Sequence, residues 1–201
     1  MALSKIGTNS LEDLSVTSGK VANDGIGPTQ LDETANYAFT GTVTGTPSVD
    51  HINSWYVDSS VSLPANTNTV VANWSQKYNY KGSVMTESSG VFTFPATGIY
   101  RVVCSLAVYN GAGSFVPYVV TNIEQSTNSG SSYSNKGFTQ NFIGSDGSGN
   151  RWHQTHTELD IDVTDASTNR LRIVVNPNSD ACNIENGNNT SYMHFMKIAD
   201  T

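Results

Sequence analysis

Charged residues are scarce in this chain of 201 residues, at 13% of the sequence. Lys and Arg together number ten, and the formal net charge is −7. Proteins that bind nucleic acid need clustered Lys and Arg to neutralise phosphates, so we expect no nucleic-acid partner. Apolar runs are also short, and none approaches the roughly eighteen residues of a membrane-spanning helix. We therefore expect no membrane insertion.

Cysteine is nearly absent, with only Cys104 and Cys182. Two cysteines are too few for a disulfide framework. Cys104 lies in an apolar run, which predicts a buried, reduced thiol. The first seven residues lack the apolar core of a secretory signal, so we expect a chain that is assembled in a cytoplasm and either stays there or leaves the cell by a route other than secretion.

Catalytic motifs are missing as well. There is no Gly-x-Ser-x-Gly elbow, no phosphate-binding Gly-Lys-Ser/Thr loop and no His-Glu-x-x-His pair. We predict a protein that is not an enzyme and that needs no cofactor. His156 shares a strand face with Glu158, Asp160 and Asp162, which could bind a hard cation weakly. His153 would point to the opposite face, and a solvated acidic surface is the preferred interpretation, so no metal site is predicted.

What the chain does have is a repeat near its N-terminus. Aliphatic residues recur every five positions, at Ile6, Leu11, Val16, Val21, Ile26 and Leu31. This period matches neither a helix nor a strand and is typical of fibrous or stacked segments. Six aliphatic side chains cannot offset the entropy of ordering the whole segment alone. The segment is therefore either disordered, wrapped around copies of itself or docked on a partner; a frayed tail with chance periodicity is the remaining alternative.

The segment from Thr40 to Pro47 has the composition of a hinge. It divides the chain into an N-terminal attachment arm, residues 1–45, and a head domain, residues 46–201. The head is rich in Ser, Thr, Asn and Gly and poor in helix-forming residues, which favours strands joined by polar turns. Strands are predicted at 52–57, 69–74, 90–94, 99–109, 115–124, 137–143, 155–163, 170–175 and 192–198.

Two of these predicted strands alternate cleanly between apolar and polar residues. Leu159, Ile161 and Val163 fall on one face of the first, as Leu171, Ile173 and Val175 do in the second. Such short alternating strands predict an all-β, antiparallel sandwich or jelly roll.

The stretch from Gly90 to Val102 is the most specific motif. It contains Phe92, Phe94, Pro95, Gly98 and Tyr100. The Gly-x-Phe, the proline and the Gly-x-Tyr resemble the strand-turn-strand motif of the jelly roll found in complement globular heads and the tumour necrosis factor superfamily. The terminal strand of that family resembles the stretch around Tyr192 and Phe195, although His194 stands where the family usually has glycine. The resemblance implies a jelly roll that assembles as a trimer. The family's collagen stalk is missing, because the chain has no Gly-x-y run.

The N-terminal segment, from Ser15 to Asp24 and from Leu31 to Gly41, resembles the attachment region of fibre proteins from tailed phages, particularly marine ones. This implies a virion structural protein: a short trimeric fibre whose arm binds a tail or capsid protein and whose head binds a glycan or protein on the host surface. A capsid decoration (cement) protein is the first alternative, and a lectin-like carbohydrate-binding module is the second.

Aromatic residues are too numerous for one sandwich core to bury. Tyr133 and Trp152, in predicted loops at 128–135 and 144–152, are candidates for receptor contact, because aromatic rings beside Asn and Ser suit stacking and hydrogen bonding. The sequence does not assign the receptor-binding residues further.

Overall fold

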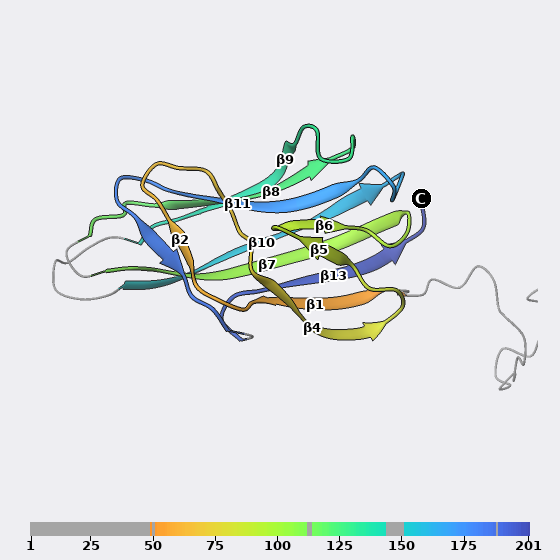
Figure 1. Cartoon of the computed structure of the whole chain (residues 1–201), viewed down its shortest axis with the longest axis horizontal. Coiled ribbons are helices and arrows are strands. Elements are labelled where there is room, and N and C mark those ends of the chain that lie inside the picture. Colours follow the sequence, from red (N-terminus) through yellow and green to blue (C-terminus); the bar gives the residue numbers. More distant parts are fainter. Residues whose placement is uncertain (1–48, 50, 112–113, 144–150, 188) are drawn as a thin grey trace, which may run out of the picture. The chain divides into compact units, whose positions relative to one another are not determined.

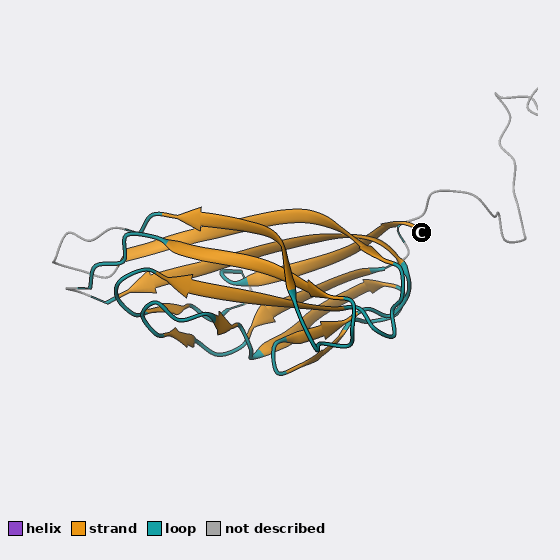
Figure 2. Cartoon of the chain, turned by 90° about the horizontal axis from the view of Figure 1, so that it is seen from above, coloured by secondary structure: helices purple, strands orange, loops and turns teal. Residues whose placement is uncertain are grey.

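The computed structural model describes residue 49 and residues 51–111, 114–143, 151–187 and 189–201. The apolar positions of the five-residue repeat and the predicted arm at 1–45 lie outside the described residues. Strands and loops make up the described part of the chain, with no helix among them (Figures 1 and 2). No helix in that part is long and apolar enough to cross a membrane.

Thirteen antiparallel strands form two sheets, a larger one of seven strands and a smaller one of six (Figure 1). The larger sheet contains β1(Ile52–Val57), β2(Val61–Leu63), β4(Trp74–Lys81), β7(Gly98–Asn110), β10(Arg151–Val163), β12(Cys182–Ile184) and β13(Tyr192–Ala199). The smaller sheet contains β3(Thr69–Val70), β5(Thr86–Ser88), β6(Val91–Thr93), β8(Val119–Ser126), β9(Ser134–Asn141) and β11(Arg170–Pro177).

The two sheets have the strand order of a jelly roll. In the larger sheet β4, β1, β13, β7 and β10 lie side by side in this order. β12 pairs with the last residues of β7, at Val108 and Tyr109, and β2 pairs with β12. The smaller sheet has the order β5, β6, β11, β8 and β9, with β3 beside β11. The predicted all-β antiparallel jelly roll is therefore confirmed.

The core lies between the sheets and is formed by the alternating apolar residues that the sequence pattern predicts. Leu171, Ile173 and Val175 of β11 are fully buried, and Ile161 and Val163 of β10 face the same interior. The acidic residues of β10 lie on the opposite, exposed side. Hydrophobic burial therefore fixes the register of both strands, because a slip by one residue would bring charged side chains inside.

The Gly90 to Val102 motif forms the aromatic centre of this core. The ring centroid of Phe92 lies 5.1 Å from that of Phe195 and 5.3 Å from that of Trp55. Phe94 packs on Tyr100 at 4.9 Å, and the Tyr100 hydroxyl donates to the Ala96 carbonyl at 3.1 Å. Burial raises the pKa of Tyr100 to about 12. The motif thus joins two strands of opposite sheets around one cluster of rings.

Pro95 and Gly98 produce the crossing between the sheets. β6 ends at Thr93 and β7 begins at Gly98, with Pro95 in the connection, where no ladder hydrogen bond from its nitrogen is needed. Tyr192 differs from the other motif residues, because it is only half-buried and lies on the outer face of the larger sheet.

Several element boundaries differ from the prediction. β2, β4, β5 and β12 were not predicted as separate strands, and the stretch from Thr69 to Trp74 divides into β3 and the start of β4. β4 has mostly exposed side chains of mixed polarity, so it carries no period-two signal. β10 begins at Arg151, and Trp152 therefore lies in a strand and not in the predicted loop.

Both cysteines are free and buried. Burial raises the pKa of each thiol to about 12, so neither forms a thiolate near neutral pH. We expect no reaction of the native protein with Ellman's reagent at pH 8 and two reactive thiols per chain after unfolding in urea. Rapid modification of either cysteine in the native protein would contradict this burial.

Candidate functional site

The outer face of the larger sheet carries exposed side chains together with small buried ones such as Ser54 and Ser105. Its side chains form cross-strand rows, since directly paired residues of neighbouring strands point to the same side. One row runs from Tyr78 through Ser54 and His194 to Val103. The next joins Tyr56 to Tyr192, and Met196 lies beside Ile52 in a third. We call this surface the aromatic face.

Three of the six exposed aromatic rings among the described residues lie on the aromatic face, namely Tyr78, Tyr80 and Trp152, whereas Phe115, Phe138 and Phe142 lie outside it. Tyr78 and Tyr80 contact each other at 5.3 Å between ring centroids, and the Lys77 ammonium lies 5.3 Å from the centre of the Tyr78 ring. Trp152 stacks on Tyr109 at 4.5 Å and is still 53% exposed. The outward face of an antiparallel sheet is ordinarily polar where it meets water, so exposed rings are unusual on such a face.

One end of the aromatic face is charged. The Arg101 guanidinium donates to both carboxylate oxygens of Asp160, at 2.9 and 3.1 Å, and lies 3.4 Å from Glu158. Hydrogen bonding from Arg101 lowers the pKa of Asp160. This carboxylate is thus engaged by a cation of the chain itself. Across the described residues, no group of three or more His, Cys, Asp or Glu side chains is placed to hold a metal ion.

His194 gives the aromatic face a dependence on pH. Its ring lies 4.9 Å from the Tyr192 ring, and desolvation, with a smaller contribution from the Lys77 charge, lowers the pKa of His194. A histidine whose pKa falls on folding binds its proton less tightly in the folded state than in the unfolded chain. His194 therefore contributes its full stabilisation of the folded state above the ordinary histidine pKa of about 6.5. This contribution is lost as the pH falls below that value and through the lower pKa of the folded state.

We expect the midpoint of thermal unfolding to decrease between pH 8 and pH 5.5, and to decrease less in the His194→Gln variant. Differential scanning fluorimetry at fixed protein concentration measures both. An identical pH response of the two proteins would exclude His194 as a source of the dependence.

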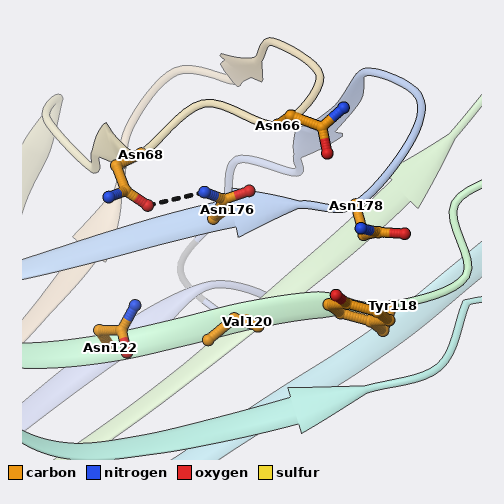
Figure 3. A pocket seen from close by; sticks show the side chains of 7 residues that line it. All are labelled: Asn66, Asn68, Tyr118, Val120, Asn122, Asn176 and Asn178. Carbon is orange, nitrogen blue, oxygen red and sulfur yellow. Dashed lines mark hydrogen bonds between the residues drawn. The ribbon is translucent and has the colours of Figure 1, made fainter.

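A second candidate site is a hollow of about 330 Å³ on the outer face of the smaller sheet (Figure 3). Its lining is formed by Asn66, Asn68, Tyr118, Val120, Asn122, Asn176 and Asn178. We call it the asparagine pocket. It lies on the opposite side of the sandwich from the aromatic face, because its lining belongs to the smaller sheet.

The pairing of β8 with β11 explains why these residues meet. Val119, Thr121 and Ile123 point into the core and are fully buried, so the residues that alternate with them point outward. Asn176 is directly opposite Val120, and the backbone N–H of Asn178 donates to the Tyr118 carbonyl at 2.9 Å. The turn before β3 brings the remaining two asparagines to the rim.

Some of the amides hold the pocket together and others are available to a ligand. Asn66 joins the turn to the end of β11 by donating to the Ser179 carbonyl at 3.4 Å and accepting from the Ser179 N–H at 3.3 Å. The Asn176 amide donates to the Asn68 carbonyl at 2.7 Å (Figure 3). The side chains of Tyr118 and Asn178 make no hydrogen bond to any described residue.

The predicted receptor residues lie apart from this pocket. Tyr133 is half-buried in the turn between β8 and β9, where the Arg172 guanidinium lies 3.8 Å from its ring centre. Its ring therefore packs against a cation of the same chain. Trp152 belongs to the aromatic face. Of these two candidates from neighbouring predicted loops, Tyr133 thus lies in a turn of the smaller sheet and Trp152 on a strand of the larger one.

The sequence contains a weak signal for the asparagine pocket that belongs to no functional motif. Asparagines alternate with other residues at 66 and 68 and again at 176 and 178, as side chains on one strand face do. Their convergence depends on contacts between segments more than a hundred residues apart, which periodicity does not report.

No protein-family model and no curated protein sequence matches the chain. Solved structures do resemble it. Murine APRIL, at pH 8.0, aligns with a TM-score of 0.55 and 7% identity over 73% of this chain and 98% of its own. The Eiger TNF of S. frugiperda aligns with a TM-score of 0.55 and 12% identity over 76% of this chain and 95% of its own. At these identities the likeness establishes the fold: the head is a jelly roll similar to those of the tumour necrosis factor superfamily.

Proposed function

We propose that the chain is a noncatalytic virion fibre protein, whose head assembles as a trimer and binds the host surface while its N-terminal arm attaches to the particle. The observation that carries the proposal is the aromatic face. This face carries the exposed side chains of Tyr78, Tyr80 and Trp152 and the half-buried side chain of Tyr192. Tyr and Trp are residue types that are enriched at protein–protein contacts.

A further copy of this chain is the occupant that we propose for the aromatic face. The resemblance to the tumour necrosis factor superfamily implies threefold assembly. Tyr and Trp supply large contact areas at low entropic cost, and Met196 adds a side chain that adapts to irregular surfaces. The Arg101 cluster at one end would form the polar rim of the contact.

The direction of the strands suits attachment at one end and binding at the other. Ile52, at the start of β1, is aligned through Met196 with Arg101, near the beginning of β7. The asparagine pocket lies toward the other end, because the last residues of β9 contact β10 next to Ala107, near the end of β7. At about 3.4 Å per residue, the six residue steps of β7 from Arg101 to Ala107 separate the two ends by about 20 Å. Three pockets per trimer would raise the effective affinity for a surface through avidity.

An added charge at Met196, which lies directly beside Arg101 on the aromatic face, should break the assembly. We expect the Met196→Arg variant of the full chain to elute as a monomer in light scattering coupled to size-exclusion chromatography, while the parent chain elutes as a trimer. Three added guanidinium groups, each beside Arg101 of its own chain, would be brought together around one axis, and this crowding of like charges in a contact is strongly unfavourable. Phe138→Arg is the matched control, because Phe138 is 62% exposed on β9 of the other sheet and should leave the trimer intact. Loss of the trimer in both variants, or in neither, would contradict the assigned surface.

Adsorption to cells tests the second half of the proposal. We expect the fluorescently labelled full chain to bind some strains of a bacterial panel and the Met196→Arg monomer to bind them at least tenfold more weakly, since it lacks avidity. Assembly without binding to any strain would instead favour the decoration-protein alternative.

A further inference from the structure

The chemistry of the asparagine pocket selects a class of ligand. None of its seven lining residues is charged. Proteins bind anions through Arg, Lys or helix N-termini and bind hard cations through carboxylates, and this lining offers none of these. Apolar ligands need a predominantly apolar lining, whereas five of the seven residues here are asparagines. What remains is a neutral ligand rich in hydrogen-bonding groups.

The arrangement of the amides matches hydroxyl groups in particular. Each asparagine presents a carbonyl acceptor and an NH2 donor side by side, while each hydroxyl both donates and accepts. The Asn178 side chain offers both kinds of group with no competing partner in the described chain. Asn176 keeps its carbonyl, and Asn68 its NH2, after their mutual hydrogen bond. Adjacent donors and acceptors of this kind suit the neighbouring hydroxyls of a sugar ring.

Tyr118 supplies the other element that a saccharide site needs. Its ring lies at one end of the lining beside Asn178, while Asn68 and Asn122 lie at the other end (Figure 3). An aromatic ring offers an apolar face to the C–H groups of a sugar and a hydroxyl that hydrogen-bonds to its oxygens. The volume of about 330 Å³ lies at the lower end of the range for small-molecule sites, about 300–1,000 Å³.

We propose that the asparagine pocket binds a neutral saccharide unit through Asn178, Asn176 and Tyr118. This inference deepens the proposed attachment function by naming the class of receptor, and its biological role rests on that function. Hydrogen bonds within the chain also hold two of the lining asparagines, Asn66 and Asn122. Asn66 fastens the turn to β11, and the Asn122 carbonyl accepts from the Asn135 amide at 2.8 Å, so the remaining groups are held in place before a ligand arrives.

Saturation-transfer NMR on the full chain tests the proposal directly. The probes are the methyl glycosides of glucose, galactose, mannose and N-acetylglucosamine at millimolar concentration, with glucuronate and N-acetylneuraminate as anionic comparisons. We expect saturation of at least one neutral glycoside. Calorimetric titration should then show at least a tenfold loss of affinity in Asn178→Ala and a smaller loss in Tyr118→Phe, which keeps the ring. Asn183→Ala, the same change on β12 of the other sheet, is the matched control and should bind as the parent does.

Three results would overturn the assignment: saturation of none of the neutral glycosides, saturation of the anionic sugars alone, or equal affinity in the parent and both pocket variants. The assay uses neither cells nor the state of assembly as its readout. If the chain binds a sugar but is monomeric, the proposed trimer is refuted and the assignment of the pocket is not affected. A trimer that adsorbs to cells without binding these sugars would refute the pocket alone.

Discussion

Replacing Phe92 with alanine should destabilise the head by about 3–5 kcal/mol. Phe92 is fully buried and touches three other aromatic side chains, with ring centroids at 5.1 Å for Phe195, 5.3 Å for Trp55 and 5.7 Å for Trp74. Truncation removes the transfer free energy of the ring and leaves a cavity that these large, rigid neighbours cannot fill. It also removes favourable edge-to-face contacts.

Urea denaturation followed by tryptophan fluorescence measures this loss, at one protein concentration because association stabilises the folded state. Phe138→Ala is the control, since that ring is largely exposed on β9 and its loss should change the free energy of unfolding by less than about 0.5 kcal/mol. Equal effects of the two substitutions would show that Phe92 is not at the centre of the core.

Replacing Gly98 with valine should cost about 3 kcal/mol, for a reason unrelated to buried area. Gly98 has φ +142°, a backbone conformation that L side chains rarely adopt. A Cβ atom there would lie 2.7 Å from the carbonyl oxygen of Ala199 and would also collide with the side chain of Lys197. Backbone strain and steric overlap each contribute about 1–3 kcal/mol.

The comparison with Gly111→Val isolates this effect, because a Cβ at Gly111 meets no atom of the described residues within 4 Å. We expect a clear decrease in the thermal unfolding midpoint for Gly98→Val and almost none for Gly111→Val. Wild-type stability of the Gly98 variant would mean that the turn between β6 and β7 is not built as described.

The sequence predicted those parts of the fold that local chemistry controls. The alternation of Leu171, Ile173 and Val175 identified β11 and its buried face. The spacing of Phe92, Pro95 and Tyr100 identified a strand, a turn and a second strand, but not that these two strands belong to opposite sheets. Strand β4 was missed because neither of its faces is consistently apolar. The pairing of Tyr192 with Ser105 shows that the Tyr192 side chain faces outward. The motif alone does not predict which face of the sheet this side chain lies on.

The candidate sites were harder to predict, for a physical reason. Asn68 and Asn176 share a hydrogen bond across 108 positions of the chain, so their proximity is a product of sheet order and not of any local pattern. The aromatic face likewise combines residues from β4, β1, β13, β7 and β10. A sequence shows that aromatic residues exceed what a core can hold, but only the pairing of strands shows which of them share a face: Tyr78 and Trp152 lie on the larger sheet, whereas Phe138 lies on the smaller one.

Sedimentation equilibrium of the full chain at micromolar concentration tests the central claim most directly, namely that the aromatic face is covered by further copies of the same chain. We predict a single species of three times the 21.6 kDa chain mass. A species at the mass of one chain, unchanged as the concentration rises, would contradict it.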